Sequence, residues 1–194
     1  MGRWLIDKEV GLSKAGAAKK DGRASARYEP DILAKGLDVV FCGINPASTA
    51  VLEGHNFSNR SNRFWLVLHL AGFTDVRLAP QEERRLLDYG CGITAVVRRA
   101  TQKASDVSPE EFRRARPVFE AKMRRHAPRV LAFLGKRALA AMTGQPDVTW
   151  GRQPEPFAGT MAWVLPNPSG LNRGFALDAL VRAYSELRSA LAEM

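Results

Sequence analysis

Val39-Val40-Phe41-Cys42-Gly43-Ile44-Asn45-Pro46 is the stretch that decides the fold. Its apolar, strand-forming residues suit a central parallel strand that is buried on both faces. The apolar run ends abruptly, which places Asn45 at the carboxyl end of the strand, where open α/β sheets gather their chemistry. Pro46 fixes its own φ and biases Asn45 away from helical geometry, so we expect Asn45 in a defined extended or turn conformation.

A second stretch, Trp163-Val164-Leu165-Pro166-Asn167-Pro168-Ser169-Gly170-Leu171, has the same order of an apolar strand followed by Asn-Pro. Asn-Pro after a strand is also an ordinary turn, and a single copy would favour that interpretation. Two copies, the second followed by Gly-Leu-Asn-Arg at 170–173, favour a functional site. We therefore predict that the two strand ends face one another and form one site.

The rest of the chain alternates apolar strands with helical patterns. We expect strands at 38–44, 129–134 and 161–165, a short apolar segment at 92–97, an irregular loop at 47–61, and helices at 62–71, 80–88, 109–125, 136–142 and 175–192. Strands separated by helices imply crossover connections and a mainly parallel sheet covered on both faces. The sequence therefore predicts an α/β protein, a three-layer α/β/α sandwich.

Two of these helices carry more detailed signals. Ser108-Pro109-Glu110-Glu111 is a capping box with proline at the first helical position. The last helix carries a single apolar stripe at helical spacing, which is expected to face the core: Leu177, Leu180, Tyr184, Leu187 and Leu191.

Length and composition narrow the class of protein. The 194 residues suit one domain, which we place at 31–194. The two cysteines and three scattered histidines offer no metal-ligand spacing, and no Gly-rich nucleotide-binding motif follows a strand, so we expect no metal and no cofactor. The sequence has no long apolar span and no secretory signal, which predicts a soluble cytoplasmic protein without membrane contact.

The net charge of +9 favours a polyanionic partner, nucleic acid first, although a basic protein without such a partner would have the same charge. Residues 1–30 mix basic side chains with Ala, Gly and Ser. We interpret them as a flexible basic arm, which either adds non-specific attraction to phosphates or is an inert extension.

Four motifs follow one another in a distinctive order and spacing: Gly43-Ile44-Asn45-Pro46, Asn62-Arg63-Phe64-Trp65, Leu86-Leu87-Asp88-Tyr89 and Asn167-Pro168-Ser169-Gly170-Leu171. In this the chain resembles the mismatch-specific uracil/thymine DNA glycosylases, the Mug/TDG branch of the uracil-DNA glycosylase superfamily, and above all its bacterial members. The resemblance extends from about Asp31 to the C-terminus and leaves out only the basic arm.

The resemblance implies both a fold and an activity. The fold is a three-layer α/β/α sandwich, in agreement with the strand and helix pattern. The activity is hydrolysis of the N-glycosidic bond of uracil, and of related damaged or mismatched pyrimidines, in double-stranded DNA, typically opposite guanine. The expected enzyme is a monofunctional monomer of base excision repair, leaves an abasic site, needs no metal or cofactor, and works in the bacterial nucleoid.

The catalytic and base-binding residues are also implied by the resemblance. Asn45 resembles the residue that positions the attacking water. Phe57 resembles the aromatic residue that stacks on the flipped base, although an aromatic residue in a polar loop is more often a core anchor. Ile44 resembles the residue whose backbone lies against that base, and Gly43 and Asn167 complete the expected base-binding set.

The loop after the last strand resembles the wedge that fills the gap left in the duplex. Gly170 would let the backbone approach the bases, Leu171 would replace the lost stacking, and Arg173 would contact the unpaired guanine. Asn172 belongs to the same wedge, at a position where close relatives have serine. The alternative is that Leu171 folds back into the core.

Three further positions depart from the family pattern. Family members commonly have a polar or charged residue in the slot of Ala95, and alanine can neither hydrogen-bond a water nor act as a base. Either the chain relies on Asn45 alone, or its site is weakened, or the slot serves only packing. Ala47 and Ala50 replace small or hydroxylic residues, which leaves open the preference among uracil, thymine and modified bases.

Three functions therefore stand against one another. The first is the glycosylase, favoured by Asn45. The second is a catalytically weakened DNA mismatch-binding module of the same fold, which Ala95 keeps open. The third is an α/β enzyme for a small anionic substrate, which leaves Leu171 and the basic arm unexplained.

Overall fold

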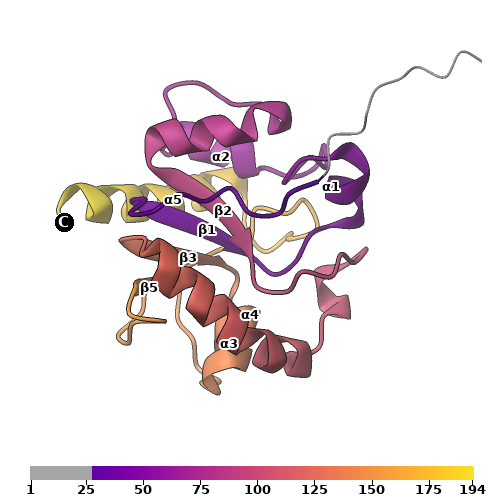
Figure 1. Ribbon diagram of the computed structural model, residues 1–194. Coiled ribbons are helices and arrows are strands. Elements are labelled where there is room, and N and C mark those ends of the chain that lie inside the picture. The colour runs from indigo at the N-terminus through magenta and orange to yellow at the C-terminus, as the bar shows by residue number, and fades with distance from the viewer. Residues whose placement is uncertain (1–27) are drawn as a thin grey trace, which may run out of the picture.

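The computed structural model of the protein describes residues 28–194 (Figure 1). Its centre is a five-stranded sheet in the order β2-β1-β3-β5-β4. Four strands run parallel to their neighbours, and the short edge strand β4 is antiparallel to β5. The strands are β1 (Val39–Gly43), β2 (Cys91–Ala95), β3 (Val130–Leu134), β4 (Gly151–Arg152) and β5 (Met161–Leu165).

Helices cover both faces of the sheet, which confirms the three-layer α/β/α sandwich. One face packs against α2 (Phe64–Leu70), the 3-10 helix η1 (Pro80–Tyr89) and α5 (Leu177–Ala192). The other face packs against α3 (Pro109–His126) and α4 (Lys136–Thr143). Figure 1 shows these layers, with α2 and α5 above the sheet and α3 and α4 below it.

The central strand β1 is buried on both faces, as its unbroken apolar run predicts. Val39 and Phe41 belong to the core beneath α2 and α5, whereas Val40 and Cys42 belong to the core beneath α3 and α4. No side chain of these four residues is more than 2% exposed. A strand that is buried on both faces does not need polar residues at alternate positions. Its sequence is therefore an unbroken apolar run, and this pattern identifies it.

The predicted cap of α3 is confirmed, and the stripe of α5 is confirmed in part. Glu111 N donates to Ser108 Oγ at 3.2 Å, and Ser108 N donates to Glu111 Oε2 at 3.0 Å. In α5 the four later residues of the stripe are buried, but Leu177 is exposed because it is the first residue of the helix, where the chain has only just reached the sheet.

Two elements differ from the sequence prediction. The segment 47–61 is not wholly irregular, because α1 (Ser48–Glu53) occupies its first half and ends at Gly54 in a left-handed conformation with φ of 79°. This helix has six residues and no side-chain cap, so it leaves no readable signal. The two-residue strand β4 was also not predicted. The basic arm predicted at 1–30 lies outside the described residues except for its last three.

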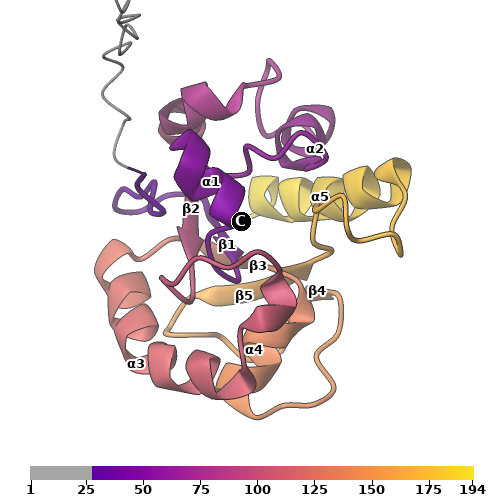
Figure 2. The same ribbon diagram turned by 90° about the vertical axis from the view of Figure 1, so that its right-hand side faces the viewer.

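The register of the parallel strands brings their carboxyl ends together. Gly43 pairs with Ala95, and Leu134 pairs with Leu165. The polar segments that follow β1 and β5 therefore leave the sheet at the same edge. Figure 2 looks toward this end of the molecule and shows α1 lying in front of the strands.

Candidate active site

A cavity of about 750 Å³ opens at the carboxyl ends of the strands. Its walls come from the end of β1 with α1, the segment 56–62, the end of β2, the segment 101–105 and the loop that follows β5. Segments more than 100 residues apart in the sequence therefore meet here. The predicted residues that line it are Gly43, Ile44, Asn45, Phe57, Ala95, Asn167, Leu171 and Asn172. Gly170 and Arg173 belong to the same loop but lie outside the cavity wall.

The amide of Asn45 is held in one orientation. Its Nδ2 donates to the carbonyl oxygen of Arg99 and to Thr101 Oγ1, both at 2.8 Å. Thr101 Oγ1 in turn donates to Lys103 O at 2.7 Å, so the threonine hydroxyl must act as acceptor toward Asn45. Because a carbonyl can only accept, the amide cannot flip. Asn45 Oδ1 makes no hydrogen bond within residues 28–194 and can accept one from a water or ligand.

Ala95 is the last residue of β2 and contributes only a methyl group to the cavity wall. The nearest charged pair lies behind it, where Lys122 Nζ is 2.9 Å from Asp31 Oδ1 and 3.5 Å from Ala95 O. Thr94 Oγ1 also donates to Asp31 Oδ1, at 2.6 Å. Among the described residues that line the cavity, none is an aspartate, glutamate or histidine. The wall therefore offers a positioned amide but no strong base.

Phe57 has an unusual backbone, with φ of 51°. A left-handed conformation is costly for a bulky residue and is kept only where the surroundings enforce it. Here the Phe57 ring stacks on Phe64, with ring centroids 4.0 Å apart and an interplanar angle of 25°. Phe64 is fully buried in the core, so it fixes the position of Phe57 in the cavity wall. Both interpretations of Phe57 therefore have a basis, because the ring packs on the core and also lines the cavity.

A polar network beside Phe57 was missed by the sequence reasoning. Asn56 lines the cavity and is buried; its Nδ2 donates to Glu83 Oε2 at 2.9 Å and to Glu29 O at 3.2 Å. Tyr28 also lines the cavity, and its hydroxyl donates to Asn56 Oδ1 at 2.9 Å. Burial, and to a lesser degree the Glu83 carboxylate, raises the pKa of Tyr28, so its hydroxyl keeps its proton. Tyr28 and Asn56 are 28 residues apart in the sequence, so their hydrogen bond leaves no sequence motif.

The loop after β5 presents Leu171 to solvent, with 77% of its surface exposed. Leu171 therefore does not fold back into the core. Gly170 lies so close to Ser61 that a Cβ at position 170 would be 2.5 Å from Ser61 O. Asn172 instead turns into the loop, where its Nδ2 donates to Asn167 O at 2.9 Å.

Several cations lie on segments around the cavity. On α3, Arg113 and Arg114 pair with Glu110, and Arg116 and Arg124 pair with Glu120. No salt bridge within residues 28–194 involves Arg60, Lys103 or Arg173, which lie on segments around the cavity, and some cations elsewhere, such as Arg77 and Arg152, are likewise unpaired. Uncompensated cations at a cavity mouth attract a polyanion.

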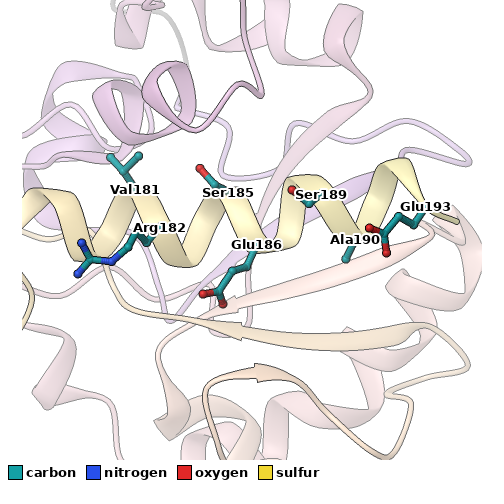
Figure 3. Close-up of a pocket in the computed structure, with 7 residues that line it drawn as sticks. All are labelled: Val181, Arg182, Ser185, Glu186, Ser189, Ala190 and Glu193. Atoms are coloured by element: carbon teal, nitrogen blue, oxygen red, sulfur yellow. The ribbon is translucent and has the colours of Figure 1, made fainter.

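A second hollow lies on the outer side of α5 (Figure 3). It is open to solvent and is lined only by that helix and its C-terminal end. The residues are Val181, Arg182, Ser185, Glu186, Ser189, Ala190 and Glu193. It shares no residue with the cavity at the strand ends, and it gathers no group of residues that predicts chemistry.

Comparison with known proteins places the chain in a family. Residues 30–188 match the model of the uracil DNA glycosylase superfamily, and the chain belongs to that superfamily. Among solved structures, it is similar to the solution structure of a protein from Methanosarcina acetivorans described as a candidate uracil DNA glycosylase. That likeness has a TM-score of 0.54 at 18% sequence identity and covers 84% of this chain and 98% of the other. At 18% sequence identity, this likeness supports the fold alone.

Two further observations concern residues 28–194. No three side chains of His, Cys, Asp or Glu come together in an arrangement that could hold a metal ion. No helix in this part of the chain has the length and apolar character needed to cross a membrane.

Proposed function

We propose that the protein is a mismatch-specific uracil-DNA glycosylase of the Mug/TDG branch, which excises uracil opposite guanine from double-stranded DNA. Membership of the uracil DNA glycosylase superfamily supports glycosylase activity on DNA. The observation that carries the finer proposal is the placement of Asn45 and Leu171 in the wall of one cavity. Its volume of about 750 Å³ falls within the usual range of ligand pockets, roughly 300–1,000 Å³.

The first step is extrusion of the base. A uracil inside the duplex must leave the stack before its sugar carbon can be attacked, at a cost of a few kcal/mol that is lowest for a mismatched pair. Leu171 is an exposed apolar side chain on the rim of the cavity and can enter the vacated space. Phe57 offers a ring, fixed by Phe64, on which the extruded base can stack.

The second step is cleavage of the bond between N1 of uracil and C1′ of the sugar. Asn45 Oδ1 accepts a hydrogen bond from a water and holds it for attack on C1′, while its Nδ2 remains bound to Arg99 and Thr101. Uracil leaves with the bonding electrons as an anion, which backbone N–H groups at the strand ends stabilise, and the water loses its proton to solvent. An amide is not a base, so we expect a slow enzyme.

The test is an excision assay. A duplex with one uracil opposite guanine is incubated with excess protein and treated with alkali, which breaks the strand at abasic sites. We expect breaks with the wild type and at least a hundredfold loss with Asn45→Ala, because the water is then unpositioned. Gln145→Ala removes a remote amide and serves as the control. Breaks that persist at the wild-type rate in Asn45→Ala would refute the assigned role of Asn45.

The lack of a carboxylate or imidazole in the described cavity wall favours a second candidate function. A mismatch-binding module of the same fold would use the same wedge and cations without cleaving the bond. Binding to the uracil–guanine duplex in preference to a matched duplex, with no alkali-sensitive breaks after prolonged incubation, would establish this alternative.

A further inference from the structure

One arginine side chain holds the loop that follows β5. Arg63, which immediately precedes α2, donates from Nε to Pro168 O at 3.4 Å and from Nη1 to Phe175 O at 2.8 Å. Its Nη2 donates to Ser169 O at 3.2 Å and to Asn172 O at 3.1 Å. The backbone N–H of Arg63 adds a fifth hydrogen bond, to Pro168 O at 3.0 Å.

Other contacts hold the two ends of this loop, where Pro168 is buried and Phe175 packs against the core and Trp150, but they hold the tip less. Its tip, 170–174, has no buried side chain, and Leu171 at its apex is exposed to solvent. Inside the loop, Asn167 Oδ1 accepts from Ser169 N at 2.9 Å, and Asn172 N donates to Ser169 O at 2.9 Å. These are local turns, which do not set the position of the loop relative to the cavity. The guanidinium spans the loop from Pro168 to Phe175 and ties it to the body of the protein.

We propose that Arg63 is the positioning residue of the wedge. It holds residues 168–175 in the shape that presents Leu171 at the cavity rim before DNA arrives. The planar, multiply donating guanidinium suits this task because one group reaches four carbonyl oxygens at once, which a lysine ammonium cannot do. The proposal rests on the proposed glycosylase function, since it assigns to Leu171 the role of entering the duplex.

The same contacts connect the wedge to the base cavity. Arg63 follows Ser61 and Asn62, which line the cavity, and Ser61 lies against Gly170. It also precedes Phe64, on which Phe57 stacks. The wedge and the cavity wall are therefore joined by a continuous set of contacts. A wedge built in this way meets the duplex without first paying the entropy of ordering an eight-residue loop.

The kinetic test compares Arg63→Lys with the wild type on two duplexes in single turnover. In the first, uracil lies opposite guanine, and we expect the rate to fall about tenfold to a hundredfold, the loss typical of misplaced groups at an active site. In the second, uracil lies opposite an abasic analogue, where no partner base must be parted from it, and we expect a loss of less than about threefold.

The matched control is Arg129→Lys. Arg129 also binds a carbonyl, Leu191 O at 3.5 Å, and a carboxylate, Asp38 Oδ1 at 2.9 Å, but it lies at the amino end of β3. We expect no change in either rate for this variant. A double-mutant cycle adds Leu171→Ala: because Arg63 acts through Leu171, Arg63→Lys should change the rate by less than about threefold in the Leu171→Ala background.

Hydrogen exchange of the amides at 169–175 tests the positioning role without any reaction. We expect faster exchange there in Arg63→Lys, with β1 and β3 unchanged; Arg63→Gln replaces it if the lysine variant does not fold. Equal rate losses on both duplexes, additive effects with Leu171→Ala, or unchanged exchange would each overturn the proposal. If the wild type excises no uracil from either duplex, the proposed function fails, and hydrogen exchange alone decides whether Arg63 orders the loop.

Discussion

Ala95→Asp adds a carboxylate to the cavity wall, where the described residues supply none. Ala95 is 8% exposed, so the new carboxylate would lie in a largely dry site, and desolvation would raise its pKa. Lys122 Nζ, 3.5 Å from Ala95 O, acts in the opposite direction and favours the ionised form, although its salt bridge with Asp31 at 2.9 Å weakens this effect. With these two influences opposed, we expect the carboxylate to be ionised at neutral pH and able to take a proton from the attacking water.

The expected gain can be bounded. General base catalysis contributes about 10²–10⁴-fold in enzymes whose base is well placed. Position 95 was not shaped around a carboxylate, so we expect the lower part of that range or less, about 10- to 100-fold, which is about 1.4–2.8 kcal/mol off the barrier. The measurement is single-turnover excision of uracil opposite guanine by Ala95→Asp, Ala95→Asn and the wild type.

The asparagine variant separates positioning from proton transfer, because it has nearly the shape of aspartate but cannot act as a base. The rate of Ala95→Asp should rise with pH as the carboxylate ionises and then level off, whereas the rates of the wild type and of Ala95→Asn should not follow that titration. If Ala95→Asp is no faster than Ala95→Asn and lacks the titration, the inference that the site lacks only a base is wrong.

Two further predictions concern the cavity wall and its charge. Glu83→Ala should lower the free energy of unfolding by roughly 2–4 kcal/mol, because two buried donors of Asn56 lose their acceptor. Glu83→Gln keeps an oxygen there and should lower the free energy of unfolding by about 1 kcal/mol or less. Denaturant unfolding measures both variants, and equal values would contradict the reasoning. Arg173→Ala should reduce the slope of log K against log salt for a mismatch duplex by about 0.9, whereas Arg113→Ala, which removes a cation paired with Glu110, should leave it unchanged.

The strands β1, β3 and β5 could be predicted from the sequence because each is a short apolar run with a sharp polar end, whereas β2 was predicted only as an apolar segment and the two-residue β4 was missed. The register of β1 with β2 and β3 then follows from parallel pairing, which is why the strand ends meet. The orientation of Asn45 could not be predicted in the same way. Its partners are 54 and 56 residues away, and one of them is a backbone carbonyl, which carries no side-chain signature.

The same limit applies to the wedge. The Asn-Pro-Ser-Gly-Leu motif indicates a loop of special function, and the exposure of Leu171 agrees with that expectation. The sequence does not indicate that Arg63 binds four carbonyls of this loop, because carbonyl acceptors are common to every residue type. The left-handed backbone of Phe57 is likewise set by packing on Phe64 and not by its own preference.

The hydrogen bonds of Asn45 also determine which residues position 45 tolerates. An aspartate there would direct one carboxylate oxygen at the Arg99 carbonyl, where two electron-rich atoms would stand 2.8 Å apart with no proton between them. Such an aspartate could remain only in its protonated form, which removes the negative charge that would make it useful. Evolution of a faster enzyme from this scaffold would therefore have to begin at some other residue of the cavity and retain the asparagine.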